Sequence, residues 1–389
     1  MTADTWGVAP SNASSVALPP ATGAWREWDH PGCRRFADVG DVRLECAGAV
    51  ADVRVAYETW GTLSRSGDNA VLVEHALTGD SHIVGPAGPG HRTPGWWEGL
   101  IGPGCAIDTN RWYVVASNVL GGCQGTTGPS SPATNGRPYG SRFPYTTVRD
   151  QVAVEVALAD RLGIDTWALV VGGSMGGMRA LEWAVGQPTR VERMFLLATA
   201  AYATGDQIAW CAPQLAAIRA DVGFQGGDYY GGPDGSGPHL GLGIARRIAH
   251  TTYRSRTELN LRFDRRPQRG EEPLGGGGRF AVESYLDHHA DKLVARFDAN
   301  SYLVLTEAMS SHDVGRGRGG VASALARVTA RTLVAGIDSD RFYPLALSEE
   351  LAAGIPDAPP VEVISSPYGH DGFLIETRRV GTLVAKLLD

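Results

Sequence analysis

One serine of the chain lies in a sequence context that can make its hydroxyl a nucleophile. The pentapeptide Gly172-Gly-Ser-Met-Gly176 places Ser174 directly after the apolar run 167–171 and before the helix-forming run 178–184. Small residues let a strand and a helix approach closely in a tight turn that presents the serine hydroxyl at the carboxyl end of the strand. In a chain with 51 glycines the pentapeptide alone is weak evidence, and the strand-and-helix context makes it specific. We therefore predict that Ser174 is a catalytic nucleophile.

A serine nucleophile needs a histidine to take its proton and a carboxylate to orient that histidine. On a strand–turn–helix nucleophile of this kind, the acid and the histidine follow in that order at the ends of later strands. The apolar run 332–335 leads into Asp338 and Asp340, and the run 361–364 leads into His370. His370 is the only histidine after position 312. We predict His370 as the base. Position alone leaves the acid open between Asp338 and Asp340.

The developing negative charge of an acyl-transfer intermediate needs two backbone N–H donors. One should follow the nucleophile, at Met175, and the other should lie in the loop after an early strand. The run 70–74 is followed by His75-Ala-Leu-Thr-Gly-Asp80, so we expect the second donor at Leu77; the alternative is a simple turn before a helix. The later loop 118–129 carries Cys123, which is a reactive thiol or, as we prefer, a small buried filler.

Other motifs carry less chemistry. Gly315 to Gly320 matches a dinucleotide-binding pattern but follows a helical stretch and no strand. Pairs such as His288-His289 have no third ligand at a suitable spacing, so we predict no metal site. The only lysines are Lys292 and Lys386, and no P-loop is present.

Composition and charge narrow the class of protein. The chain has 389 residues, is 43% hydrophobic and carries a net charge of −7, which is typical of a folded protein without an affinity for nucleic acid. No apolar run approaches the length of about 18 residues that a membrane helix needs, and the N-terminus lacks the features of a secretory signal. The 5 cysteines are scattered, which favours a reducing compartment. We expect a soluble cytoplasmic protein that binds neither nucleic acid nor membrane.

Hydrophobic periodicity predicts the elements that position these residues. Residues 42–46 and 53–57 alternate as a hairpin, whereas 70–74, 112–116, 167–171 and 194–197 are apolar runs typical of buried parallel strands. Thr147 and Asp150 predict a capping box at the start of a helix. The pattern is α/β, but it changes to mostly helical after residue 200, with a glycine-rich loop at 264–279 that is mobile by composition. We predict a flexible arm at 1–40, an α/β core at 41–200 and 330–389, and a helical insert at 201–329.

Several strings together resemble one known family. These are His75 to Asp80, Asn118 to Pro129, Gly172 to Met178, Val282 to Leu293, Arg296 to Tyr302 and Tyr368 to Asp371. They are similar to the homoserine O-acetyltransferase family of the α/β-hydrolase superfamily, over a stretch from about residue 40 to the C-terminus. The resemblance implies an α/β-hydrolase core with a mostly parallel sheet and a helical lid.

The resemblance also implies roles for individual residues. It matches Ser174 to the acylated serine, His370 to the base and Asp340 to the acid. Arg246, in a run that ends at Tyr253, resembles the arginine that holds the substrate carboxylate, although Arg247 lies beside it, and Asp371 resembles the partner of the substrate ammonium.

The activity implied is transfer of an acetyl group from acetyl-CoA, a substrate and not a permanently bound cofactor, to the hydroxyl of L-homoserine. A homodimer joined through the insert is implied as well. A succinyl donor, serine or another alcohol such as an antibiotic precursor as acceptor, and a serine esterase remain the alternatives.

Overall fold

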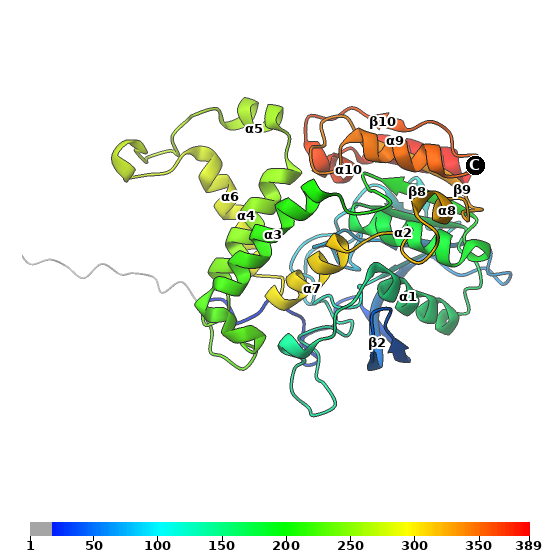
Figure 1. Ribbon diagram of the computed structural model, residues 1–389, viewed down its shortest axis with the longest axis horizontal. Coiled ribbons are helices and arrows are strands. Elements are labelled where there is room, and N and C mark those ends of the chain that lie inside the picture. Colours follow the sequence, from blue (N-terminus) through cyan, green and yellow to red (C-terminus); the bar gives the residue numbers. More distant parts are fainter. Residues whose placement is uncertain (1–17) are drawn as a thin grey trace, which may run out of the picture.

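An eight-stranded sheet in the order β1-β2-β6-β3-β7-β8-β9-β10 runs through the centre of the molecule (Figure 1). The computed structural model describes residues 18–389. The strands of this sheet are β1 (Arg35–Arg43), β2 (Ala49–Trp60), β3 (Ala70–Glu74), β6 (Tyr113–Ser117), β7 (Leu169–Gly173), β8 (Arg193–Leu197), β9 (Arg331–Ile337) and β10 (Glu362–Ile364). β1 pairs with β2 and β2 with β6 in antiparallel fashion, and every pair from β6 to β10 is parallel. The predicted mostly parallel α/β sheet is confirmed. A second, two-stranded sheet joins β4 (Ile101–Gly102) to β5 (Ile107–Asp108).

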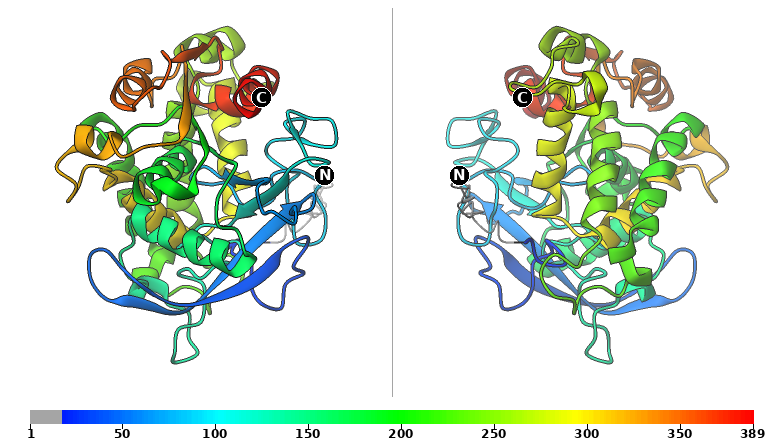
Figure 2. Two further views of the ribbon diagram at one scale, coloured as in Figure 1. Left: turned by 90° about the vertical axis from the view of Figure 1, so that its right-hand side faces the viewer. Right: turned by 90° about the vertical axis from the view of Figure 1, so that its left-hand side faces the viewer.

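The N-terminal boundary differs from the prediction. Of the expected arm 1–40, residues 1–17 lie outside the described residues, and residues 35–40 belong to β1, which forms a long curved hairpin with β2 at the sheet edge (Figure 2). The segment before β1 is also anchored, because Gly23 N–H donates to Phe297 O at 3.1 Å and Trp25 N–H donates to Cys123 O at 2.9 Å. A Cβ at Gly23 would lie 2.5 Å from the nitrogen of Phe297. Small residues and backbone hydrogen bonds hold this segment, and neither produces a hydrophobic period.

Helices cover both faces of the sheet. α1 (Val148–Leu162), α2 (Met175–Gly186) and α9 (Leu345–Gly354) share one apolar cluster with alternate strand residues, and α11 (Thr377–Leu388) shares the cluster on the opposite face. The predicted capping box is present: Asp150 Oδ2 accepts from Thr147 N–H at 2.8 Å, and the Thr147 hydroxyl accepts from Asp150 N–H at 3.3 Å. The closing helix expected near 373–388 is divided at Glu376 into the short α10 (Gly372–Ile375) and α11.

Most of the expected helical insert forms a layer beside the sheet, whereas its last helix, at residues 321–325, packs on the core beside β9 (Figure 1). Its helices are α3 (Gly205–Ala220), α4 (His239–Tyr253), α5 (Arg256–Phe263), α6 (Ala281–Val294), α7 (Ala299–Ser310) and α8 (Val321–Leu325). α4 packs between α3 and α6. The loop 264–279 projects outward, and Arg279 at its end pairs with Glu271 at 2.6 Å and with Asp287 at 2.9 Å. Among residues 18–389, no helix is long and apolar enough to cross a bilayer.

Candidate active site

Ser174 lies in the turn between β7 and α2 with an unusual backbone conformation. Its φ of 57° and ψ of −126° are disfavoured for a residue with a Cβ, so the surroundings must hold the turn. They do so from both sides, because Ser174 N–H donates to Leu197 O at 3.0 Å and the Thr199 hydroxyl donates to Ser174 O at 2.8 Å. The residue is buried, with 5% of its surface exposed. The predicted strand–turn–helix arrangement around Ser174 is therefore present as a strained, closed turn, and the role of Ser174 as nucleophile stays a prediction.

Two glycines of this turn have no room for a side chain. A Cβ at Gly176 would lie 2.2 Å from the carbonyl oxygen of Glu74, and a Cβ at Gly173 would lie 2.5 Å from the ring of Phe373. The first contact brings the start of α2 against the loop after β3. The second brings Ser174 toward the segment that carries His370. The glycines thus assemble the site by allowing three separate loops to touch.

The structure separates the two candidate aspartates. Asp340 Oδ2 accepts a hydrogen bond from His370 Nδ1–H at 2.6 Å, and its other oxygen accepts from the backbone N–H groups of Phe342 and Tyr343, each at 2.8 Å. Asp338 instead accepts from Ser366 N–H at 3.0 Å. Asp340 therefore orients the imidazole, whereas Asp338 holds the backbone of the loop before His370.

Ser174 and His370 lie among the same aromatic side chains. The Tyr343 ring stacks on the His370 ring with centroids 4.9 Å apart. Burial raises the pKa of Tyr343 well above its usual value, and the nearby Ser174 side chain opposes part of that rise. The Phe373 ring packs edge-on against the His370 ring, with centroids 5.4 Å apart. His370 Nε2 is buried and has no hydrogen-bond partner within residues 18–389. Catalytic hydrogen bonds often tighten only when substrate binds, so a buried Nε2 without a partner is compatible with the predicted role of His370 as the base.

The loop after β3 brings Leu77 to the site. Within the part of the chain that the structure describes, neither the Leu77 N–H nor the Met175 N–H donates a hydrogen bond, and both residues belong to one buried cluster. The neighbouring Thr78 carbonyl is held by Arg296, whose Nη1 donates to it at 2.8 Å. Two unused donors on adjacent loops match the arrangement that an oxyanion requires.

His75 links this loop to the loop 118–129. Its Nδ1–H donates to Ala76 O at 2.8 Å and its Nε2 accepts from Val119 N–H at 3.2 Å, which describes a neutral imidazole. Burial lowers the pKa of His75 to about 3, with a further contribution from the positive charge of Arg179. His75 therefore acts as an uncharged cross-link at neutral pH.

Sequence reasoning missed a buried charge cluster beneath the turn. Arg179, which is fully buried, pairs with Glu155 at 2.7 Å and with Glu74 at 3.1 Å, and it donates to His75 O at 2.8 Å. Burial raises the pKa of Glu74 well above its usual value, against the effect of Arg179. The signal was available, because an arginine within the apolar helical run 178–184 needs a buried partner.

The structure distinguishes Arg246 from Arg247 on α4. Arg247 is engaged on the outside, where its Nη2 lies 2.8 Å from Asp287. Arg246 has no ion pair among residues 18–389, its Nε is buried without a partner, and its guanidinium lies 5.5 Å from the Tyr253 ring. The Tyr253 ring in turn lies 5.7 Å from the His370 ring. The Tyr253 ring therefore lies between the unpaired guanidinium of Arg246 and His370, the candidate base.

Asp371 lies beside His370 but is not free. Arg254, a residue that sequence reasoning missed, contacts it at 3.3 Å and also pairs with Glu258 at 2.9 Å. Burial raises the pKa of Asp371, and the charges of Arg246 and Arg254 oppose that rise. A ligand ammonium at Asp371 would therefore share the carboxylate with Arg254.

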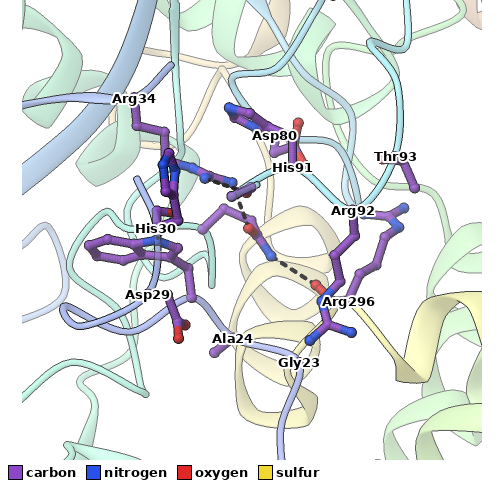
Figure 3. Close-up of a pocket in the computed structure, with 13 residues that line it drawn as sticks. Gly23, Ala24, Asp29, His30, Arg34, Asp80, His91, Arg92, Thr93 and Arg296 are labelled. Carbon is purple, nitrogen blue, oxygen red and sulfur yellow. Dashed lines mark hydrogen bonds between the residues drawn. The ribbon is translucent and has the colours of Figure 1, made fainter. Parts of the chain in front are cut away.

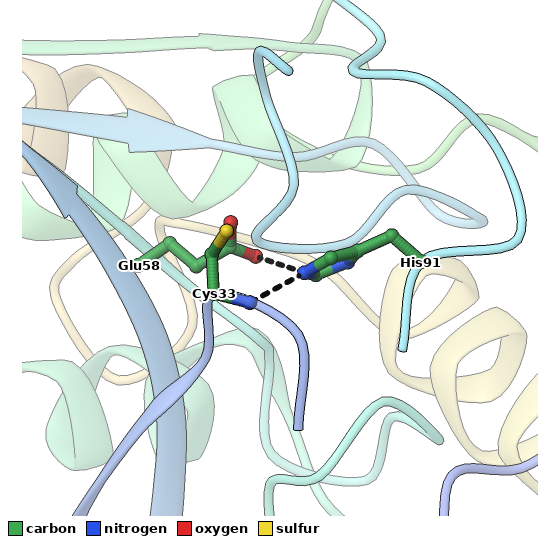
Figure 4. A group of neighbouring side chains, drawn as sticks. All are labelled: Cys33, Glu58 and His91. Atoms are coloured by element: carbon green, nitrogen blue, oxygen red, sulfur yellow. Dashed lines mark hydrogen bonds and ion pairs between the residues drawn. The ribbon is translucent and has the colours of Figure 1, made fainter. Parts of the chain in front are cut away.

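Two other sequence expectations concern groups outside the site. Cys123 is 2% exposed and burial raises its pKa, which agrees with a buried filler and not with a reactive thiolate. No metal site was predicted, yet Cys33, Glu58 and His91 bring one potential ligand atom each within 4.8 Å of one another (Figure 4). Two of the three groups are already engaged, since His91 Nε2 accepts from the backbone N–H of Cys33 at 2.9 Å and Glu58 pairs with His82 at 3.0 Å.

Comparisons with known proteins identify the fold and the family of the chain. The family model described as alpha/beta hydrolase fold matches residues 69–377. A homoserine O-acetyltransferase of Thermobifida fusca is 64% identical over 95% of this chain and 97% of its own length. Among solved structures, a homoserine O-acetyltransferase from Bacillus anthracis superimposes with a TM-score of 0.83 at 27% identity, covering 92% of this chain and 97% of that one. The esterase E22 gives a TM-score of 0.82 at 26% identity, covering 92% and 99%.

The TM-scores to the esterase and to the transferase are nearly equal, so the fold does not distinguish the two families. The 64% identity to the Thermobifida fusca relative does. On that identity over nearly the whole length, the chain belongs to the homoserine O-acetyltransferase family of the α/β-hydrolase fold.

Proposed function

We propose that this protein transfers an acetyl group from acetyl-CoA to the hydroxyl of L-homoserine through an acetyl ester on Ser174. The observation that carries the proposal is the His370 imidazole, which is oriented by Asp340 at 2.6 Å, keeps a free Nε2 and stacks on Tyr343, a side chain that also lies close to Ser174. The relative of Thermobifida fusca, at 64% identity, carries the name of this activity. Methionine biosynthesis follows from that name as the setting of the reaction.

In the first half-reaction, His370 Nε2 takes the proton of Ser174 as Oγ attacks the thioester carbonyl. The oxyanion is stabilised by the unused N–H groups of Leu77 and Met175; losing one such donor typically lowers the rate by about 10²–10³-fold. The carbonyl then re-forms, the carbon–sulfur bond breaks, and the CoA sulfur receives the proton from His370. Asp340 stabilises the imidazolium that exists between these steps.

In the second half-reaction, the homoserine hydroxyl gives its proton to His370 and attacks the acetyl carbon on Ser174. The proton then returns to Ser174 Oγ as the ester bond to the enzyme breaks. The unpaired Arg246 would bind the substrate carboxylate, and Asp371 would bind its ammonium. Tyr253 lies between Arg246 and His370 and would position the amino acid against the imidazole.

The decisive experiment traps the acyl-enzyme. Wild-type protein mixed with acetyl-CoA and no acceptor should gain one acetyl group, which peptide mass spectrometry should locate on Ser174, and added homoserine should discharge it. Initial rates with both substrates varied should give parallel double-reciprocal lines. A Ser174→Ala variant that still gains the acetyl group from acetyl-CoA, or turns over near the wild-type rate, would refute the mechanism.

The competing activity is ester hydrolysis, which the likeness to esterase E22 favours. Water competes for any acyl-serine, so a transferase must exclude it and position the alcohol. The deep burial of Ser174, 5% exposed, supports transfer. Steady-state rates measured with acetyl-CoA or succinyl-CoA as donor, each with homoserine, serine or water as acceptor, distinguish the alternative donors, acceptors and hydrolysis. A preference for succinyl-CoA would overturn the proposed donor, and rapid release of acetate without acceptor would favour an esterase.

The insert helices support a homodimer. α3 and α4 pack against each other, yet Trp210 on α3 and Leu240 on α4 remain 37% and 68% exposed. Ile208 and Ile244 on the same two helices are 41% and 37% exposed. Such an apolar surface is covered in solution if a second copy binds there, which sedimentation velocity can test. All 5 cysteines are free, which supports a reducing, cytoplasmic location.

A further inference from the structure

A polar pocket of about 260 Å³ lies next to the loop that carries Leu77 (Figure 3). Its walls come from the N-terminal segment around residues 23–34, from Asp80, from the loop 90–93 and from Arg296 between α6 and α7. The same Arg296 donates to the Thr78 carbonyl, so the pocket is connected to the candidate oxyanion loop through one side chain. None of the residues placed in the mechanism above lines it.

Three guanidinium groups line this pocket without an ion pair. Arg34 lies on one side and Arg92 and Arg296 lie on the other, and none of them forms a salt bridge within residues 18–389 (Figure 3). Two carboxylates, those of Asp29 and Asp80, face them. Each of these carboxylates also accepts a backbone N–H, that of Arg26 at 2.8 Å and that of His82 at 3.0 Å. The lining therefore retains an excess of positive charge.

The arginine at the back of the pocket is rigidly built in. Arg34 is 6% exposed, and its terminal nitrogens donate to Gly90 O at 2.7 Å and to Gln124 Oε1 at 2.8 Å. Its Nε is buried and has no acceptor in the described chain. His91 has the same property on the neighbouring wall: because its Nε2 accepts from Cys33 N–H, its neutral ring carries the proton on Nδ1, which is also without an acceptor. Burying and fixing the Arg34 guanidinium in this way is costly unless an anion compensates its charge.

We propose that this pocket binds the phosphate groups of the acyl donor. The inference rests on the proposed function, in which the donor is a thioester of a phosphorylated carrier. Guanidinium groups bind phosphate oxygens through directed pairs of N–H donors, and Arg92 and Arg296, which have no ion pair within residues 18–389, offer such donors, while Arg34 adds a fixed positive charge opposite them. Its volume of about 260 Å³ is below the roughly 300–1,000 Å³ that encloses a whole ligand, which suits a diphosphate group with the rest of the carrier outside. The thioester end would then extend past Thr78 to Ser174.

The test compares a donor with phosphates to a donor without them. Acetyl-CoA and S-acetyl-N-acetylcysteamine both present an acetyl thioester, but only the first carries phosphate. Arg92 is exposed, so Arg92→Ala should fold normally. We expect it to lower the ratio of kcat/KM for acetyl-CoA to kcat/KM for the short thioester by about tenfold, mainly through KM. Arg65→Ala, an exposed arginine outside the pocket, is the matched control and should leave the ratio unchanged.

The outcomes separate this inference from the proposed function. A wild-type protein that transfers acetyl from neither donor would refute the function, whereas transfer from both with an unaltered ratio in Arg92→Ala would refute the pocket alone. Inorganic phosphate is the second probe. If the pocket takes the donor, phosphate should inhibit the acetyl-CoA reaction competitively in wild type and less in Arg92→Ala. Phosphate that raises the melting temperature without competing with acetyl-CoA would assign the pocket to a free anion and overturn the proposal.

Discussion

The two sides of the candidate active site treat their charges differently. On the sheet side, Arg179 is fully buried between Glu74 and Glu155. On the side formed by the insert and the N-terminal segment, Arg246 and Arg34 have buried Nε atoms and no ion pair among the described residues. Burying charge is unfavourable on both sides, but only the charge of Arg179 is compensated by carboxylates of the protein.

This difference indicates two tasks. A buried charge with partners fixes the backbone, and Arg179 does so by joining α2 to the loop after β3, through Glu74 and the carbonyl of His75. The Arg246 guanidinium, which has no ion pair among the described residues, keeps its donors for a ligand, whereas Arg34 is fixed by Gly90 O and Gln124 Oε1 and contributes mainly its charge. We therefore expect changes on the sheet side to affect stability or the chemical step, and changes on the insert side to affect substrate affinity.

The largest effect on rate should come from the charge that orients the imidazole. Asp340→Asn removes the anion that stabilises His370 as imidazolium, and kcat should fall by about 10⁴-fold. Asp338→Asn is the matched control, because Asp338 contacts only the Ser366 backbone and should leave kcat within about tenfold. Steady-state kinetics decide between the two aspartates. Equal losses in both variants would contradict the assignment.

Breaking the paired cluster should cost the most stability. Arg179→Met leaves two buried carboxylates without a cation, which typically costs about 3–5 kcal/mol. Urea unfolding followed by circular dichroism measures the loss. Arg246→Met, the counterpart on the other side, removes no ion pair and should change the unfolding free energy by less than about 1 kcal/mol. A similar loss in both variants would remove the distinction between the two sides.

Binding should be most sensitive at Arg246. Arg246→Ala should raise KM for homoserine by about 10–100-fold, the value of charge-assisted hydrogen bonds of about 1.5–3 kcal/mol, while KM for acetyl-CoA changes far less. Arg247→Ala controls for charge on the same helix, because Arg247 is already paired with Asp287. An affinity loss confined to Arg247→Ala would show that the wrong neighbour was chosen.

The smallest effect concerns pH and the sheet side. Unfolded His75 binds a proton near its ordinary pKa of 6.5, whereas burial keeps the folded residue neutral down to a pKa of about 3. The unfolded chain therefore binds more protons between these values, and the stabilising contribution falls as pH decreases, by on the order of 1–2 kcal/mol from pH 7 to pH 5. His75→Gln should remove that part of the slope in unfolding titrations, and exposed His288→Gln should not. An unchanged slope in His75→Gln would show that folded and unfolded His75 bind protons alike, so that burial does not lower its pKa.

Local sequence was sufficient for the strained turn and for most of the core. The turn at Ser174 could be predicted because each requirement, a strand before it, small residues around it and a helix after it, is satisfied by neighbours in the chain. The capping box at Thr147 was predictable for the same reason. Where anchoring depends on backbone hydrogen bonds, as between Gly23 and Phe297, no local pattern exists and the expected boundary at residue 40 was wrong.

The sequence by itself determined where the nucleophile, the histidine and the alternating elements lie, because hydrophobic period and turn chemistry act over a few residues. Position in the chain left Asp338 and Asp340 open and the family resemblance favoured Asp340; the tertiary structure placed Asp340, and not Asp338, against His370 and gave Arg179 its carboxylates. The physical reason is that charge pairing depends on distance in space. Asp340 and His370 are 30 residues apart in the chain yet 2.6 Å apart in the fold, and the parallel order of β9 and β10 creates that proximity.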